Sequence, residues 1–452
     1  MVKRADDGGV ATSRLQAAPA LLGSLSSHLE RFAGAVEPQE RAALMSLLRA
    51  AGDYTPRRLV AATPAEMLLG AAESAIVERL RAEPSPESCD FQASLTIIVK
   101  ATRLCNLRCT YCHSWSGDPG NKMSFEVLAR AIRDGLRAPN VRNVNFVWHG
   151  GEVTLLPLSF YRKAVWLQEQ FRRRGQIVTN TVQTNGTRLS REWLTFLRLY
   201  EFKIGVSLDG PPELHDRRRL DIAGRPTSER VRKSLAEIRA EGLDYGVLLV
   251  VDDEVVKLGP RRILDYFLEI GVGHVCLINV IPVNDPAKAR REDFLRWDRF
   301  VEFLRGLFRE WWPRYADRIS FREIADLMGK VQGRKAATCL FAGKCMGQYL
   351  TIEPAGEVAA CDKYVGDEGF RFGNLLDRDL SAMSLSPSVA KARADTAEAA
   401  AGAEACAWFD VCQGGCPHDR YLRRLYREPR DESCCGLAPL LADVAAAVGG
   451  SR

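Results

Sequence analysis

Three cysteines, Cys105, Cys109 and Cys112, stand close together early in the chain, where they could bind a metal centre through sulfur. A structural zinc site needs a fourth ligand nearby, and its four ligands usually come from two Cys-x-x-Cys pairs. Three thiolates on a four-iron cluster instead leave one iron open to a bound molecule. The trio therefore predicts an open iron–sulfur cluster, and a degenerate zinc knuckle is the alternative.

A second group of cysteines occupies the last quarter of the chain. The chain has thirteen cysteines in all, and disulfide bonds are unusual in a cytosolic protein of this size. Clustered cysteines in such a protein indicate metal binding. Cys89 and Cys276 stand apart from both groups, and we expect them to be small buried residues. The second group comprises Cys339, Cys345, Cys361, Cys406, Cys412, Cys416, Cys434 and Cys435.

The composition is that of a globular protein with a sizeable core. Of the 452 residues, 46% are hydrophobic and 27% are charged, which excludes a disordered or fibrous chain. The longest apolar runs, such as 247–251, are far too short to span a membrane, and the N-terminus lacks the apolar core of a signal peptide. The net charge of +6 is too balanced to indicate nucleic-acid binding. We therefore expect a cytoplasmic protein with no membrane or nucleic-acid partner.

From Ser94 onwards, apolar runs alternate with amphipathic stretches, which predicts strands separated by helices. Parallel βαβ units produce this pattern, so we expect an α/β fold with an open sheet or a partial barrel. The predicted strands span 94–101, 144–148, 177–182, 203–207, 245–251 and 274–280. The predicted helices between them span 124–138, 158–174, 190–201, 228–242 and 260–271, and a further helix covers 292–315.

The regions on either side of this core differ from it. Residues 1–92 are expected to form a helical extension, in which Thr63 caps a helix that begins at Pro64 and continues to Leu80. From about residue 331 the chain becomes irregular, Gly-rich and Cys-rich. The sequence therefore predicts three domains, covering residues 1–92, 93–330 and 331–452.

The cysteine trio, with Tyr111 before its last cysteine, resembles the signature of radical S-adenosylmethionine (SAM) enzymes. Further motifs agree with this resemblance in the right order, and each ends a predicted strand, where α/β folds place their ligands. They are the segments 149–152 (His-Gly-Gly-Glu), 183–187 (Gln-Thr-Asn-Gly-Thr) and 207–211 (Ser-Leu-Asp-Gly-Pro). The resemblance implies a partial (β/α)6 barrel that binds SAM at an open [4Fe–4S] cluster.

The resemblance also implies roles for single residues. Gly150 and Gly151 would let the backbone approach the amine of SAM, and Glu152 would brace that amine. Arg219 would pair with the SAM carboxylate, as suits a guanidinium, with a solvated basic run as the alternative. The remaining candidates for binding the cofactor are Tyr111, Ser207, which would assist Arg219, and Asn185, which would meet the ribose.

The C-terminal cysteines resemble those of a SPASM domain, which carries two auxiliary iron–sulfur clusters. By this resemblance, the first auxiliary [4Fe–4S] cluster is bound by Cys339, Cys345, Cys361 and Cys416. The second is bound by Cys406, Cys412 and Cys434, with Ala403 where a leading cysteine is expected. Its fourth ligand is left open between Cys435, Glu404 and a small molecule, and zinc is the alternative for the whole region.

Two activities within this family fit the sequence. The sequences of the motifs resemble those of anaerobic sulfatase-maturating enzymes, which oxidise Cys or Ser to formylglycine. However, His149 replaces the usual Gln, His113 and Ser114 replace an aromatic pair, and Val153 replaces a common Pro. His-Gly-Gly-Glu is typical of maturases that crosslink ribosomally made peptides through cyclophane or thioether bonds. We therefore favour an oxidoreductase of this peptide-maturase class, with sulfatase maturation second and a non-catalytic iron–sulfur protein third.

Asp362, directly after Cys361, is the predicted catalytic base, because the matching Asp of sulfatase-maturating enzymes takes a proton from the substrate. An Asp bonded to its own turn is the alternative, and His149 is the next candidate base. The expected partners are a small precursor peptide and a reducing donor such as flavodoxin or ferredoxin. The N-terminal extension is expected to hold a leader peptide or cover the barrel mouth, or simply to pack on the outside.

Overall fold

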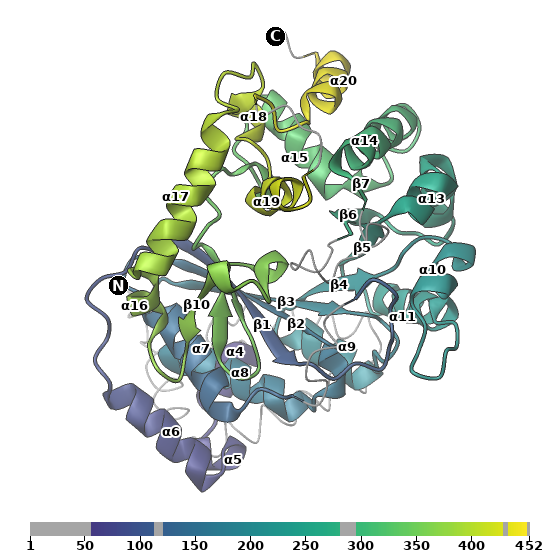
Figure 1. The fold of residues 1–452 in the computed structure, drawn as a ribbon. Helices are drawn as coiled ribbons and strands as arrows, with labels where there is room; N and C mark the ends of the chain where they lie inside the picture. Colours follow the sequence, from purple (N-terminus) through teal and green to yellow (C-terminus); the bar gives the residue numbers. More distant parts are fainter. Residues whose placement is uncertain (1–55, 113–120, 281–294, 428–432, 450–452) are drawn as a thin grey trace, which may run out of the picture.

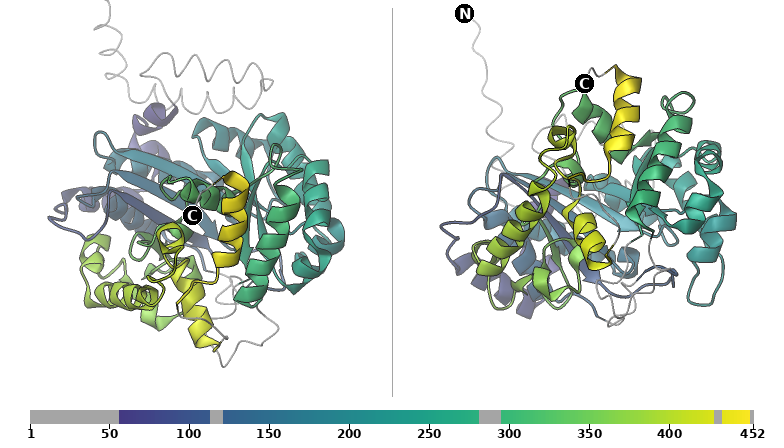
Figure 2. Two further views of the ribbon diagram at one scale, coloured as in Figure 1. Left: turned by 90° about the horizontal axis from the view of Figure 1, so that it is seen from above. Right: turned by 45° about the horizontal axis from the view of Figure 1, so that its top comes forward.

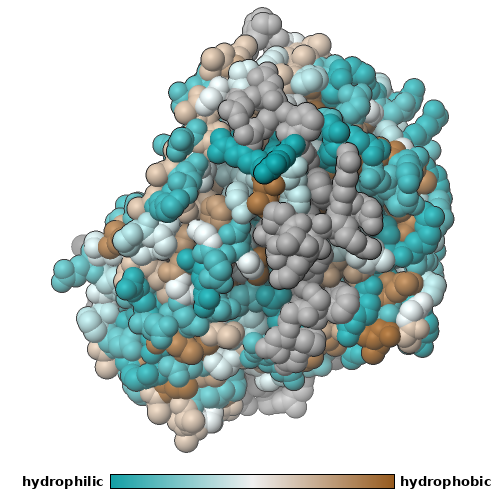
Figure 3. Space-filling view, viewed as in Figure 1, coloured by the Kyte–Doolittle hydropathy of each residue, from teal (hydrophilic) through white to brown (hydrophobic). Residues whose placement is uncertain are grey.

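The computed structural model describes residues 56–112, 121–280, 295–427 and 433–449 (Figure 1). Residues 1–55 of the predicted extension lie outside the described residues, as do His113 and Ser114. Among the described residues, no helix is both long enough and apolar enough to cross a membrane. Hydrophilic and hydrophobic side chains are interspersed on the face shown in Figure 3.

Six parallel strands, paired in chain order, form the centre of the molecule, and this confirms the predicted α/β core. Each strand lies within two residues of its predicted position, because apolar side chains recur along these segments as a buried parallel sheet requires. The strands are β1 (Ser94–Thr102), β2 (Asn143–Gly150), β3 (Ile177–Thr184), β4 (Lys203–Ser207), β5 (Tyr245–Val251) and β6 (His274–Asn279). A short β7 (Ser320–Phe321) pairs with β6.

Helices connect these strands and lie along the outside of the curved sheet (Figure 1). Serine side chains fix two of the helix starts: Ser124 Oγ accepts from Val127 N at 3.2 Å, and Ser190 Oγ accepts from Trp193 N at 3.3 Å. The helices are α7 (Phe125–Arg137), α8 (Leu158–Phe171), α9 (Arg191–Leu199), α10 (Pro212–Arg218), α11 (Ser228–Ala240), α12 (Asp253–Leu258), α13 (Pro260–Glu269), α14 (Trp297–Trp311) and α15 (Arg322–Val331).

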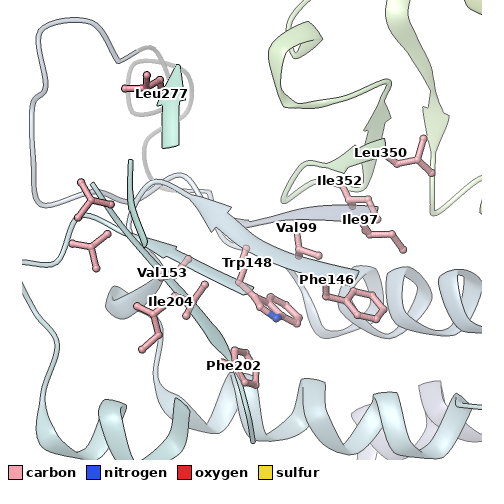
Figure 4. Packing of buried hydrophobic residues seen from close by; sticks show 14 of the residues in the cluster. Ile97, Val99, Phe146, Trp148, Val153, Phe202, Ile204, Leu277, Leu350 and Ile352 are labelled. Atoms are coloured by element: carbon pink, nitrogen blue, oxygen red, sulfur yellow. The ribbon is translucent and has the colours of Figure 1, made fainter. Parts of the chain in front are cut away.

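The main core lies between the sheet and these helices, and alternation along each strand determines which side chains enter it. In β2, Phe146 and Trp148 are fully buried and stack with ring centroids 6.2 Å apart (Figure 4). The residues that alternate with them, such as Val147 and His149, point to the opposite face and are only half buried. The strands therefore turn apolar side chains outward to the helices and leave polar ones facing inward.

The C-terminal region is more regular than predicted. Strand β8 (Tyr349–Ile352) pairs in parallel with β1, and β9 (Glu357–Ala359) and β10 (Arg371–Asn374) extend the sheet antiparallel to it. The described sheet thus has ten strands and crosses the boundary predicted at residue 331. The helices here are η3 (Cys339–Phe341), η4 (Asp362–Tyr364), η5 (Glu368–Phe370), α16 (Leu380–Ser384), α17 (Pro387–Ala401), α18 (Phe409–Cys412), α19 (Pro417–Leu425) and α20 (Ala438–Val448).

Two of these helices explain why an irregular region was the wrong expectation. Helix α17 has Ser386 as its cap, Pro387 in its first turn and an alanine-rich interior, all of which favour a helix. Helix α20 lies against α14 and α15 (Figure 2), where Asp443 accepts from Arg305 Nε at 3.1 Å. The last helix therefore fastens the C-terminal region to the barrel.

Residues 65–82 of the N-terminal extension form two helices where one was predicted. Helix α5 (Ala65–Leu68) ends at Leu69, and α6 (Ala71–Ala82) begins after Gly70, whose N–H donates to Glu73 Oε2 at 2.9 Å. Glycine is a poor residue inside a helix, and Glu73 stabilises the new start by capping it. The carbonyl of Thr63 accepts from Trp166 Nε1 at 3.0 Å.

The described part of the extension packs on the outside of the barrel (Figure 1). Helix α4 (Pro56–Ala61) contacts α8, and α6 contacts α7. Lys163 of α8 binds Glu73 at 2.6 Å, and Arg79 binds Glu126 of α7 at 2.7 Å. Residues 56–82 therefore pack on the outside of the barrel, which was one of the roles considered for the extension.

Candidate functional site

The loop that follows β1 holds the cysteine trio at the carboxyl end of the sheet. Cys109 is 6% exposed, and Cys105 and Cys112 are half buried. Burial raises the pKa of Cys105 to about 12 and that of Cys109 to about 11, and the neighbouring thiols add to both shifts. The free thiols of Cys105 and Cys109 are therefore protonated at neutral pH, and a bound iron cluster would take the place of those protons.

Two glycines at the end of β2 clamp this loop. Gly151 N donates to Thr102 O and Glu152 N donates to Leu104 O, both at 2.7 Å. A Cβ atom on Gly150, which has φ +125°, would lie 2.3 Å from Thr102 O, and one on Gly151 would lie 2.0 Å from Leu104 O. The close approach of two backbones therefore requires both glycines, which adds a structural role to the one expected from the sequence.

Glu152 is buried and held by three neighbours. Its Oε1 accepts from Thr154 N at 3.0 Å, from Thr154 Oγ1 at 2.6 Å and from Thr184 Oγ1 at 2.6 Å. Its Oε2 accepts from Asn185 N at 2.7 Å. A carboxylate has about four lone-pair sites on its two oxygens, so Oε2 can accept a further bond from an ammonium group.

The ends of β3 and β4 contribute Asn185 and Ser207. Asn185 Nδ2 donates to Asn106 Oδ1 at 2.9 Å, which joins the end of β3 to the cluster loop. Asn185 Oδ1 accepts from Thr187 N at 3.0 Å. Ser207 Oγ accepts from Gln183 Nε2 at 3.1 Å. The ends of β2 and β3 thus contact the cysteine loop, and Ser207 at the end of β4 is bonded to β3.

Arg219 and Tyr111 form a buried polar cluster with Asp209. Tyr111 OH donates to Asp209 Oδ2 at 2.6 Å and accepts from Arg219 Nη1. Burial alone would raise the pKa of Asp209, but the charges of Arg218 and Arg219 hold it below its usual value. Among the described residues, the buried Nε of Arg219 has no hydrogen-bond partner. An unpaired guanidinium N–H beside the cysteine loop fits the carboxylate end of SAM.

The four cysteines assigned to the first auxiliary cluster lie near one another. Each of the thiols Cys345, Cys361 and Cys416 has its pKa raised, chiefly by burial, and other members of the set add to the shift, after Asp419 in the case of Cys416. The pKa reaches about 12 for Cys345 and about 11 for Cys416. Lys363 Nζ lies 3.7 Å from Cys416 Sγ and 2.9 Å from Asp419. This cation would balance part of the negative charge of a cluster with four thiolates.

The second group of thiols gathers in pairs. Cys406 Sγ lies 3.9 Å from Cys434 Sγ, and Cys412 Sγ lies 3.3 Å from Cys435 Sγ. Within the described ranges, no three His, Cys, Asp or Glu side chains form a group that could hold a single metal ion. A four-iron cluster is larger and binds each thiolate at a separate iron, so its ligands need not converge on one point.

The two predicted catalytic candidates come together around a residue that the sequence analysis missed. Lys100 Nζ forms a salt bridge with Asp362 Oδ1 and lies 3.4 Å from His149 Nδ1. Lys100 and His149 are register partners on β1 and β2, and Asp362 begins η4 directly after Cys361. Lys100 could have been singled out as the one charged residue in its strand.

The charges of this group, which we call the Lys100 cluster (Lys100, His149 and Asp362), determine its protonation. Burial and the Lys100 charge lower the pKa of His149 to about 4, so the imidazole is neutral at pH 7. Burial alone would raise the pKa of Asp362, but Lys100 and His149 bring it down to about 2. The Asp362 side chain remains 35% exposed. The cluster thus presents an ionised and accessible carboxylate beside the first auxiliary cysteines.

Comparisons with known proteins follow the same division of the chain. Residues 99–257 match the model of the radical SAM superfamily, and residues 339–417 match that of an iron–sulfur cluster-binding domain, SPASM. A serine-type anaerobic sulfatase-maturating enzyme of Klebsiella aerogenes is 31% identical over 318 residues, covering 69% of this chain and 77% of that protein. A cysteine-type anaerobic sulfatase-maturating enzyme of Clostridium perfringens is 30% identical over 334 residues, covering 71% of this chain and 88% of that protein.

A solved structure agrees with these relatives. It is described as native anSMEcpe with bound AdoMet and Cp18Cys peptide, and it superposes with a TM-score of 0.64 at 27% identity. The match covers 78% of this chain and 99% of that one. The similarity therefore extends over the barrel and the C-terminal region together.

Proposed function

The chain belongs to the family of radical SAM enzymes with a SPASM domain that includes the anaerobic sulfatase-maturating enzymes, and on that premise we propose that it oxidises a side chain of a peptide substrate. It is an oxidoreductase whose cofactors are SAM and [4Fe–4S] clusters, in a number that fits the sulfatase-maturating enzymes. The observation that carries the proposal is the Lys100 cluster, which presents a carboxylate beside the cysteines of the first auxiliary cluster.

The described residues fit these cofactors. When bound, SAM and the clusters supply a radical that takes a hydrogen atom from the substrate and an acceptor for a second electron. In our proposal, Cys105, Cys109 and Cys112 hold the first cluster, and Arg219 Nε and Glu152 Oε2 bind the two charged ends of the methionine part of SAM. The remaining SAM contacts come from Tyr111, Gly150, Gly151, Asn185 and Ser207.

Asp362 is our proposed catalytic base. After the hydrogen atom has left, the substrate radical must lose one proton and one electron to complete a two-electron oxidation. The carboxylate of Asp362 accepts the proton, because the pKa of about 2 keeps it ionised at neutral pH. Lys100 holds this carboxylate at the end of β1, and His149 lies on the other side of the lysine as a neutral imidazole.

A peptide is the proposed substrate, and two products are compatible with this chemistry. The similar solved structure contains a Cys peptide, and the curated relatives are sulfatase-maturating enzymes, which supports formylglycine. His149 supports the crosslinked peptide favoured by the sequence. Sulfatase-maturating enzymes usually have Gln at this position, and the substituted residue lies in the Lys100 cluster itself. A flavodoxin or ferredoxin is the proposed electron donor.

Mass spectrometry of two probes tests this proposal. We expect the dithionite-reduced enzyme to oxidise either a Cys- or Ser-containing sulfatase peptide or a peptide encoded beside its gene. A carbonyl trapped by hydroxylamine would identify formylglycine, and a loss of two hydrogens without a trappable carbonyl would identify a crosslink. SAM cleavage without modification of either peptide would contradict the proposal.

A substitution of Lys100 tests the arrangement of the Lys100 cluster. We expect Lys100→Met to lower the rate of product formation about tenfold, because losing a charge-assisted bond to Asp362 leaves the base poorly placed. 5′-Deoxyadenosine should still form, so its ratio to modified peptide should rise, and Lys100→Arg should restore part of the coupling. Lys163→Met removes a lysine paired with Glu73 on the outer helices and is the matched control. An unchanged ratio in Lys100→Met would show that the lysine has no part in the reaction.

A further inference from the structure

Cys435 lies among the thiols of the second auxiliary site, although the family pattern gives it no role. Its side chain is buried (4% exposed), and its Sγ is 3.3 Å from Cys412 Sγ. The adjacent Cys434 has its Sγ 3.9 Å from the Sγ of Cys406. The thiols of Cys434 and Cys435 also interact with each other, so the four sulfurs form one continuous group.

The backbone around Cys435 is fixed by side chains that are distant in the sequence. Cys435 O accepts from Trp297 Nε1 at 2.9 Å and from Arg423 Nη1 at 3.2 Å. Gly436 has φ +88°, and a Cβ there would lie 2.8 Å from Trp297 Nε1, so only glycine fits without displacing the indole. Gly436 N also donates to Cys434 Sγ at 3.3 Å. The turn is therefore built around a buried tryptophan and fixes the backbone of both cysteines beside the site, while their side chains can still rotate to bind separate irons.

The other candidates for a fourth ligand fit less well. Ala403 occupies the position of the expected leading cysteine, and its buried methyl group cannot bind iron. Glu404 next to it is exposed to solvent. A disulfide between Cys412 and Cys435 would need the sulfurs about 2.05 Å apart, well below the 3.3 Å seen. A purely hydrophobic role would not require the sulfur of Cys435 to face a proposed iron ligand.

We infer that Cys435 is the fourth thiolate ligand of the second auxiliary cluster and replaces the cysteine that is missing at Ala403. Each of the four irons then binds one sulfur, from Cys406, Cys412, Cys434 or Cys435, and Cys435 loses its thiol proton when the bond forms. A cluster with four protein thiolates has no open iron. The second auxiliary site thus carries electrons and does not bind a small molecule or the substrate.

Iron analysis and electron paramagnetic resonance (EPR) of the full chain, reconstituted without oxygen, test this assignment. The wild type should bind roughly twelve irons, from three clusters of about four. Cys435→Ala should lose about four irons, or about one iron with the signal of a three-iron cluster in its place. Cys276→Ala, which removes a half-buried thiol from β6, is the matched control and should keep the full iron content.

Cys435→Ser keeps the size of the side chain, so it tests the assignment even if the alanine variant misfolds. We expect its oxygen ligand to shift the EPR signal of one cluster while the SAM-binding cluster stays unchanged. Iron content and spectra identical to the wild type in both variants would overturn the assignment, as would zinc bound at this site. Neither readout needs a peptide, so the assignment can fail while the proposed peptide oxidation stands, and the reverse is also true.

Discussion

Replacing Cys105, Cys109 and Cys112 together with alanine is expected to abolish cleavage of SAM. The loop that carries these thiols is held at the end of β2 by backbone hydrogen bonds from Gly151 and Glu152. Arg219, which is bonded to Tyr111 of the same loop, lies beside it. Without the three thiolates, no iron can be held at this position to reduce SAM. Chromatography should find no 5′-deoxyadenosine above the background of an enzyme-free sample, while roughly eight irons stay bound in the C-terminal region.

The control for this variant removes cysteines that stand outside the three groups. Cys89→Ala combined with Cys276→Ala should leave SAM cleavage at the wild-type rate, because neither thiol lies in a proposed cluster site. The absorption of the auxiliary clusters in the triple variant verifies that the C-terminal region is still folded. Formation of 5′-deoxyadenosine by the triple variant would mean that the catalytic cluster lies elsewhere.

Asp362→Asn is expected to separate radical formation from product formation. The amide cannot accept the substrate proton, and losing an acid–base group typically costs on the order of a hundredfold in rate. Modified peptide should fall by about that factor, while 5′-deoxyadenosine continues to form, because Asp362 is absent from the proposed SAM contacts. The measurement is the amount of both products per enzyme, with iron content checked to show that the neighbouring Cys361 still binds its cluster.

A nearby carboxylate provides the comparison for Asp362. Asp377 is exposed and takes no part in the Lys100 cluster, so Asp377→Asn should keep both products at wild-type levels. Wild-type rates of peptide modification in Asp362→Asn would assign Asp362 a structural role. The base would then have to be another group, and His149 is the next candidate because it lies in the same cluster.

The barrel could be predicted from the sequence because its signals are local. Each strand is a short apolar run that ends in a motif with polar residues or glycine, and each connecting helix has an apolar face and a recognisable start such as Ser124 or Ser190. The C-terminal helices were missed because the spacing of cysteines and glycines dominates that region. Helix α17 nevertheless carries ordinary helix signals, including Ser386 as its cap.

The members of the candidate site could be proposed from the sequence, but their contacts could not. The motifs pointed to Arg219 and Asp362, but the partners that hold them are distant in sequence. Lys100 is 262 residues from Asp362, and they meet only because β8 pairs with β1 and brings the C-terminal region to the barrel end. The contact of Cys435 with Cys412 likewise depends on how Trp297 fixes a turn 138 residues away.

The transfer of deuterium from the substrate tests the central claim most directly. A peptide shown to be modified is prepared with deuterium on the carbon that is oxidised, and the 5′-deoxyadenosine formed from it is examined by mass spectrometry. If the enzyme abstracts a hydrogen atom from the peptide side chain, 5′-deoxyadenosine gains one deuterium in step with the modified product. Unlabelled 5′-deoxyadenosine alongside fully modified peptide would contradict the account.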